Sequence, residues 1–137
     1  MFYSLAARTH RYIPAFLLGL SAALAGAKSM ADALPAVPVG DAEHGKTLYA
    51  TCAACHSVDE NDIGPLHRGV VGRRAGSVPD YNYSAALKNS GIVWDETQLN
   101  RWLVNPSAMV PGTKMFFKLD DAQMRADIIA YLKTQNK

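Results

Sequence analysis

The sequence predicts a small, single-domain, all-α fold. Three segments each begin at an aspartate suited to cap a helix and continue with apolar residues at helical spacing. The stretches between them are rich in Gly and Pro, which is typical of loops. No segment sustains the alternation of polar and apolar residues that a half-buried strand shows. Helices joined by irregular loops are therefore the expected architecture.

The first predicted helix begins near Asp41, a favourable N-cap residue. Its neighbouring faces carry Gly45, Leu48, Tyr49 and Cys52. A glycine inside a helix costs about 1 kcal/mol relative to alanine. We therefore expect another backbone to pack closely against Gly45.

The second predicted helix begins at Asp95, with Gln98 at the spacing of a capping box. Asn105 precedes a proline, and this predicts that the helix ends there. One apolar stripe runs along it, made by Leu99, Trp102 and Leu103.

The third predicted helix begins at Asp120, again with a capping-box partner, Gln123. Its apolar stripe is made by Met124, Ile128, Tyr131 and Leu132. A short helical turn is also expected over residues 84–88.

The two cysteines of the chain both lie in the segment CAACH, residues 52–56. Cys-x-x-Cys-His is the spacing that attaches haem c covalently. On a helical turn, positions i, i+3 and i+4 share a face, so Cys52, Cys55 and His56 would point at one porphyrin. Each thiol can then add across a vinyl group while the imidazole reaches the iron. The motif predicts one covalently bound haem c, with His56 as an iron ligand.

Two other interpretations of the cysteine pair fit less well. A thioredoxin-type redox motif is expected in a chain of alternating strands and helices, and that alternation is missing from the pattern. A structural zinc site needs four protein ligands. After residue 33 the chain offers only two cysteines and His44, His56 and His67.

Residues 1–33 have the pattern of an export signal. Arg8, His10 and Arg11 form a basic start, and residues 14–25 are uncharged and mostly apolar. This stretch is shorter than the about 20 residues needed to span a bilayer. We expect cleavage after Ala27 or Ala33, and the alternative is an uncleaved signal that anchors the chain to the periplasmic face of the inner membrane. The functional domain is expected in the periplasm.

Residues 34–40 are a Pro-rich linker, and residues 41–137 form the predicted domain. Without residues 1–33, 104 residues remain, with 11 Lys plus Arg and 11 Asp plus Glu. This length suits one small domain. A net charge near zero argues against a nucleic-acid partner.

A haem held by His56 needs a second axial ligand. Met115 ends an irregular loop that can bring its thioether to the iron. Met124 lies on a helical apolar stripe, where a methionine is usually core filler. His44 lies too near the attachment site to cross the porphyrin. The remaining candidates are Met109 and His67.

At this point the chain resembles the class I c-type cytochromes, such as mitochondrial cytochrome c and short soluble bacterial cytochromes c. The resemblance extends from about residue 41 to residue 137. Besides CAACH, it rests on these ordered segments: GP (64–65), GRRAG (72–76), YNYS (81–84), GIVW (91–94), NP (105–106), PGTKM (111–115) and DIIAYL (127–132).

The resemblance implies the class I cytochrome c fold, with three main helices and loops wrapped around one covalent haem. It implies that Met115 is the sixth ligand and that the Pro65 carbonyl accepts a hydrogen bond from His56. It also implies that four side chains surround a haem propionate: Arg73, Tyr83, Trp94 and Thr113.

Three positions depart from the family pattern. Leu87 stands where an asparagine is frequent, and Trp102 stands where a tyrosine approaches the methionine sulfur. His67 follows the Gly-Pro pair in place of a leucine and is an alternative ligand. The redox potential therefore does not carry over.

The predicted function is single-electron transfer, without a catalytic residue or a small-molecule substrate. With both axial positions filled, no substrate reaches the iron. Docking of a monomeric carrier should be transient. Four lysines are candidates for the docking surface: Lys46, Lys88, Lys114 and Lys118.

The resemblance implies redox partners such as a quinol-oxidising cytochrome complex, a terminal oxidase or a photosynthetic reaction centre. A periplasmic dehydrogenase is a further partner. Two alternatives stay open, namely a haem subunit bound permanently to a dehydrogenase, and a peroxidase-like or gas-binding haem protein with a labile sixth ligand.

Overall fold

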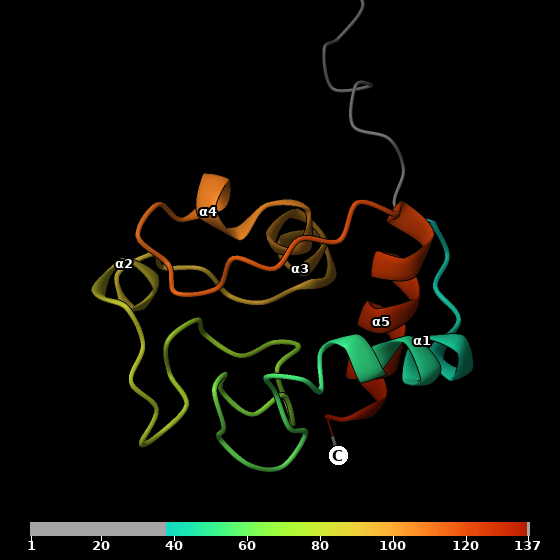
Figure 1. Cartoon of the computed structure of the whole chain (residues 1–137), viewed down its shortest axis with the longest axis horizontal. Helices are drawn as coiled ribbons and strands as arrows, with labels where there is room; N and C mark the ends of the chain where they lie inside the picture. Colours follow the sequence, from blue (N-terminus) through green and yellow to red (C-terminus); the bar gives the residue numbers. More distant parts are fainter. Residues whose placement is uncertain (1–37, 137) are drawn as a thin grey trace, which may run out of the picture. The chain divides into compact units, whose positions relative to one another are not determined.

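A computed structural model describes residues 38–136 of the chain (Figure 1). The predicted signal peptide and residues 34–37 of the predicted linker lie outside the described residues. The described part contains the helices α1 (Ala42–Leu48), η2 (Tyr49–Thr51, a 3-10 turn), α2 (Ala85–Lys88), α3 (Glu96–Val104), α4 (Pro106–Met109) and α5 (Ala122–Thr134). Extended pairing within this part is limited to one bridge, between Arg74 and Val93. The all-α prediction is confirmed.

The helices α1 and α5 pack directly on each other, so the first and last helices of the described chain are in contact (Figure 1). An ideal Cβ on Gly45 would lie 1.9 Å from the carbonyl oxygen of Asp127. Only a glycine permits this approach of the two backbones. The Asp41 side chain caps α1, and its own backbone N–H donates to the Asp127 carboxylate at 2.8 Å. The expected close packing at Gly45 is confirmed.

The last residues of the predicted linker belong to the folded part. A Cβ on Gly40 would lie 2.1 Å from the carbonyl oxygen of Ala126 on α5. The carbonyl of Val39 accepts a hydrogen bond of 2.9 Å from the Gln123 side chain. Residues 39 and 40 of the predicted linker are therefore held along α5.

Asn105 separates two helices. It ends α3, which begins at the predicted cap Asp95, whose carboxylate accepts from the Gln98 N–H at 2.7 Å. The Asn105 side chain then caps α4 by accepting from the Ala108 N–H at 3.1 Å. The residues before Pro106 predicted the end of α3, whereas α4 was not predicted. The proline that stops one helix is well suited to the first turn of the next.

The predicted start of α5 at Asp120 is wrong by one residue. Asp121 is the cap, and its carboxylate accepts from the Met124 N–H at 2.9 Å. The carbonyl of Asp120 instead accepts from the Arg125 guanidinium at 2.7 Å. That bond holds the chain just before the helix and leaves the next aspartate to cap it.

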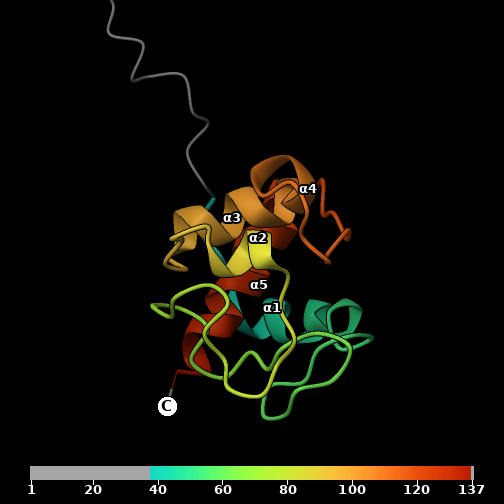
Figure 2. The same ribbon diagram turned by 90° about the vertical axis from the view of Figure 1, so that its left-hand side faces the viewer.

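The loops of residues 52–80 lie on one side of α2, and α3 and α4 lie on the other (Figure 2). A short pairing connects these loops to the segment before α3. The Gly72 N–H donates to the Trp94 carbonyl at 2.7 Å, and the Ala75 N–H donates to the Ile92 carbonyl at 2.8 Å. The predicted turn after Ser84 is present as α2, with the Ser84 hydroxyl as its cap.

One hydrophobic core joins the loops to α3 and α5. Its most deeply buried side chains include Trp102, Leu99, Ile128, Ile129 and Leu132. Across residues 38–136, no helix has the length and apolar character that a membrane crossing requires.

Candidate functional site

The two cysteines and His56 lie on one helical turn that continues η2. The N–H of Cys55 and the N–H of His56 both donate to the Cys52 carbonyl, at 3.0 and 2.9 Å. Cys52 is half-buried, Cys55 is exposed, and both are free thiols. Burial raises the pKa of the Cys52 thiol, and the Thr51 hydroxyl partly offsets this shift. Both thiols are thus available for addition to an alkene.

The His56 imidazole is held in one orientation. Its Nδ1 donates to the Pro65 carbonyl at 2.7 Å, which leaves Nε2 as the nitrogen with a free lone pair. The backbone of Gly64 lies against the ring, since a Cβ there would come within 2.3 Å of His56 Cε1. Burial lowers the pKa of His56, while the Pro65 bond and Asp62 raise it. A neutral, oriented imidazole is the form that binds a metal.

His67 stacks on His56 from the same side of the site. The two ring centroids lie 4.0 Å apart with an interplanar angle of 17°. His67 Nδ1 is hydrogen-bonded to the Tyr49 hydroxyl at 2.9 Å. Burial lowers the pKa of His67 to about 3, and the charges of His56 and Arg73 add to the shift. A ring stacked on His56 cannot reach the opposite face of an iron bound by His56.

Met115 is positioned by the loop after α4. The Thr113 N–H donates to the Val110 carbonyl at 3.1 Å, and the Thr113 hydroxyl accepts from the Met115 N–H at 3.4 Å. The indole N–H of Trp102 donates to the Met115 sulfur at 3.1 Å. This hydrogen bond uses one sulfur lone pair and leaves another for a soft metal.

Two other candidate ligands, His44 and Met124, lie on α1 and α5. His44 Nδ1 is bonded to the Asp127 carboxylate at 2.7 Å, on the α1 and α5 side. Met124 is half-buried on α5.

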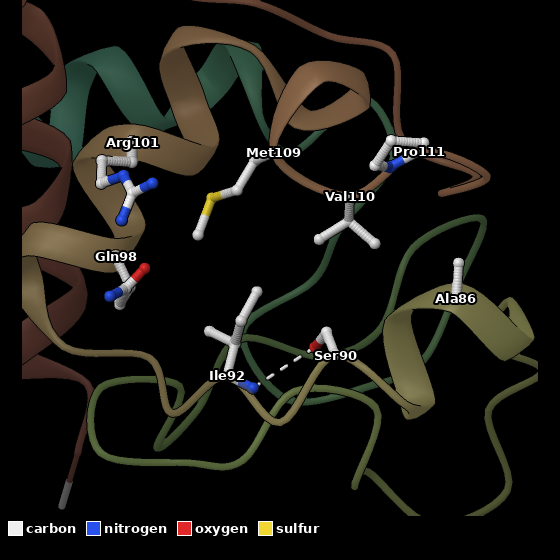
Figure 3. Close-up of a pocket in the computed structure, with 8 residues that line it drawn as sticks. All are labelled: Ala86, Ser90, Ile92, Gln98, Arg101, Met109, Val110 and Pro111. Carbon is white, nitrogen blue, oxygen red and sulfur yellow. Dashed lines mark hydrogen bonds between the residues drawn. The ribbon is translucent and has the colours of Figure 1, made fainter.

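Met109 points into a separate hollow of about 420 Å³ that contains none of the predicted haem residues (Figure 3). The hollow is lined by Ala86, Ser90, Ile92, Gln98, Arg101, Met109, Val110 and Pro111.

Three of the predicted propionate neighbours are close together. The backbone N–H of Trp94 donates to the Arg73 carbonyl at 2.9 Å. Burial raises the pKa of Tyr83, and the nearby Arg73 charge opposes that rise. The guanidinium of Arg73 is fixed by the carbonyls of Arg68 and Leu66, at 2.8 and 2.7 Å. Burial lowers the pKa of Arg73, and Tyr83 opposes this shift.

The fourth predicted neighbour, Thr113, is buried and lies two residues before Met115 in the chain. Trp94 is 7% exposed, and its ring lies against that of Trp102, with centroids 5.2 Å apart. An indole N–H can donate to a carboxylate, so Trp94 is a side chain of a type that can pair with a propionate.

Together these groups fit a haem c. Two free thiols and an imidazole share one turn, a thioether is supplied by a separate loop, and donors suited to carboxylates lie nearby. Bound haem would be held by Cys52 and Cys55, with His56 and Met115 toward the iron.

Two contacts at this site were not anticipated from the sequence. One is the direct hydrogen bond from Trp102 to Met115; the family resemblance placed Trp102 near the methionine sulfur but did not predict that its indole N–H donates to it. The other is the stacking of His67 on His56. Both join residues from separate segments, so no local pattern indicates them.

The sequence profile of the family described as Cytochrome c matches residues 42–136. Cytochrome c2 of Rhodomicrobium vannielii is 48% identical over 105 residues, which cover 74% of this chain and 84% of that protein. Cytochrome c of Euglena viridis is 52% identical over 99 residues, covering 69% of this chain and 97% of that protein. The solved structure of cytochrome cH from Methylobacterium extorquens matches with a TM-score of 0.67 and 48% identity, covering 69% of this chain and 99% of that one.

Proposed function

Because this chain belongs to the cytochrome c family and carries electrons on one covalently bound haem c, we propose that His56 and Met115 are the two axial ligands of its iron. The observation that carries this assignment is the orientation of His56. Its Nδ1 is committed to the Pro65 carbonyl at 2.7 Å, so that Nε2 alone is left for the metal. Met115 is the methionine that a loop and a specific hydrogen bond hold in place.

The residues around the ligands prepare the site for fast exchange of one electron. The bound haem supplies an iron that alternates between the ferrous and ferric states. The Pro65 carbonyl makes His56 a stronger donor, whereas the Trp102 N–H withdraws electron density from the Met115 sulfur. A thioether ligand favours the ferrous state and raises the potential. Half-buried ligands on a fixed scaffold change little between the two states, which keeps reorganisation small.

The inner haem propionate also needs partners from the protein. Burying a carboxylate without a partner is costly. Arg73, Tyr83, Trp94 and Thr113 are the side chains proposed to surround the inner propionate. The guanidinium of Arg73, fixed by the carbonyls of Arg68 and Leu66, supports this role.

We further propose that the domain works in the periplasm after removal of residues 1–33. Two points support this location. Residues 1–33 have the pattern of an export signal, and haem c is attached to a chain after its export. The proposed partners are a quinol-oxidising complex, a terminal oxidase, a reaction centre or a dehydrogenase, each docked transiently.

The proposed ligand pair is tested by the optical spectrum of the haem-loaded protein expressed in the periplasm. The ferric protein should show the weak near-infrared band of sulfur-to-iron coordination. The band should vanish in Met115→Ala and persist in Met124→Ala, a matched change of a methionine on α5. A wild-type protein without the band, or a Met115→Ala protein that retains it, would refute the assignment.

A further inference from the structure

Two large exposed apolar side chains flank the proposed ligand pair. Ile63 is 72% exposed and Phe116 is 73% exposed. Ile63 directly precedes Gly64, whose backbone lies against the His56 ring. Phe116 directly follows Met115. Exposed apolar groups next to a functional centre are typical of an interaction surface.

These two positions border the same surface. The Tyr81 hydroxyl donates to the Ile63 carbonyl at 2.5 Å. The Lys114 ammonium donates to the Asn82 carbonyl at 2.7 Å. The first bond is made by the tip of the Tyr81 side chain and the second ends on the Asn82 backbone, so the segments 60–63 and 114–118 both contact residues 81–82. We call the surface formed by these two segments the bipolar face.

The charge changes sign across the bipolar face. Glu60 and Asp62 are exposed beside Ile63, and Lys114 and Lys118 are exposed on either side of Phe116. Asp59, the neighbouring acid, is paired with Arg68, so this pair adds little net charge. One half of the surface is therefore acidic and the other half is basic.

We propose that the bipolar face docks a redox protein of complementary pattern. That partner would carry an apolar centre, a basic group opposite Glu60 and Asp62, and an acidic group opposite Lys114 and Lys118. The inference rests on the proposed function and specifies its partner. It differs from the lysine-rich docking surface expected from the sequence, because a divided surface attracts both signs of charge locally while the net charge stays small.

Two small oxidants of opposite charge test the division. The ferrous, haem-loaded protein gives one electron either to hexacyanoferrate(III), an anion, or to tris(phenanthroline)cobalt(III), a cation. Each oxidant is reduced by one unit as the haem iron becomes ferric. Second-order rate constants are measured while ionic strength is raised from about 10 to about 200 mM, a range over which screening becomes strong. Both rate constants should fall, because each oxidant is attracted to its own half of the face.

Charge reversals then assign each half. At about 10 mM ionic strength, Lys118→Glu should slow the reaction with hexacyanoferrate about three- to tenfold and speed the reaction with the cobalt complex. Asp62→Lys should do the opposite. Exposed charges on α1 and α5, outside the bipolar face, provide the controls Glu43→Gln and Lys133→Gln, which should change either rate less than about twofold. The near-infrared band verifies that every variant keeps the wild-type ligands.

The outcomes separate the inference from the proposed function. The bipolar face is refuted if the rate constant of one oxidant rises with ionic strength, or if the control variants change the rate constants as much as the charge reversals do. In both cases the proposed function of electron transfer is unaffected. If the ferrous protein reduces neither oxidant, the proposed function fails and this inference fails with it.

Discussion

The indole nitrogen of Trp102 lies 3.1 Å from the sulfur of Met115 and donates a hydrogen bond to it. Trp102 is 6% exposed and its ring lies 5.2 Å from that of Trp94, so α3 holds the donor rigidly. A hydrogen bond to a ligating sulfur is one of the means by which a protein adjusts a redox potential. The bond thus couples a core helix to the proposed ligand on a loop.

Replacing Trp102 with phenylalanine should lower the midpoint potential. The change removes the N–H and keeps an aromatic side chain in the core. Without that donor the sulfur gives more electron density to the iron, and this favours the ferric state. A hydrogen bond is worth about 1 kcal/mol, and only part of it differs between the two states. We expect the midpoint potential to decrease by about 20 to 40 mV. For a one-electron couple, a shift of about 59 mV is a tenfold change in the equilibrium constant.

Redox titration of wild type and Trp102→Phe measures this shift. Persistence of the near-infrared band in the variant shows that Met115 is still bound. An unchanged or higher potential would show that the Trp102 bond does not adjust the iron.

Adding one methyl group at Gly45 should strongly destabilise the domain. A Cβ there would lie 1.9 Å from the Asp127 carbonyl oxygen, so α1 and α5 must move apart. Overpacking typically costs 1 to 3 kcal/mol, and backbone is less able to yield than a side chain. We expect Gly45→Ala to lower the free energy of unfolding by about 3 kcal/mol. Denaturant unfolding measures it, with the exposed α1 change Thr47→Ala as control.

A loss below about 0.5 kcal/mol in Gly45→Ala, the level of an ordinary surface change, would contradict the close contact of the two helices.

The hydrogen bonds to Asp127 should make stability depend on pH in the acid range. The Asp41 N–H, the Gln123 amide and His44 together hold the pKa of this carboxyl below its ordinary value of 3.8. The unfolded chain therefore binds the proton more readily than the folded protein. The stabilisation is present above the ordinary pKa and is lost as pH falls through the lowered pKa of the folded state.

Asp127→Asn removes this titration. Unfolding of both proteins, followed by circular dichroism from pH 6 down to pH 2, should show a shallower loss of stability in the variant over the acid range (about pH 5 to 2). Equal slopes for the two proteins would mean that Asp127 does not contribute to acid sensitivity.

Removing the Tyr49 hydroxyl should leave His67 without its partner. The Tyr49 ring is also packed on Tyr131, with centroids 5.1 Å apart, and Phe keeps that contact. An unsatisfied polar group costs about 1 to 3 kcal/mol when buried. Because His67 is half-buried, we expect Tyr49→Phe to cost about 1 kcal/mol of unfolding free energy.

A double-mutant cycle with His67→Leu isolates this hydrogen bond. In the His67→Leu background the further loss of the hydroxyl should cost clearly less, because the acceptor has been removed. Equal costs in both backgrounds would show that the two side chains are not coupled.

The sequence by itself determined the all-α class, the helix caps at Asp41 and Asp95, and the turn that carries Cys52, Cys55 and His56. Each of these depends on residues a few positions apart, where hydrogen bonds and side-chain spacing are local. The close approach at Gly45 was also foreseeable, because a helical glycine is costly unless packing requires it.

The tertiary structure alone decided the contacts between distant segments. The N-cap of α5 is Asp121 and not the predicted Asp120, because the Arg125 guanidinium donates a hydrogen bond to the carbonyl of Asp120. The bond from Trp102 to Met115 and the stacking of His67 on His56 likewise join separate segments. Such contacts depend on how loops pack around α3 and α5, and neither periodicity nor capping chemistry specifies that packing.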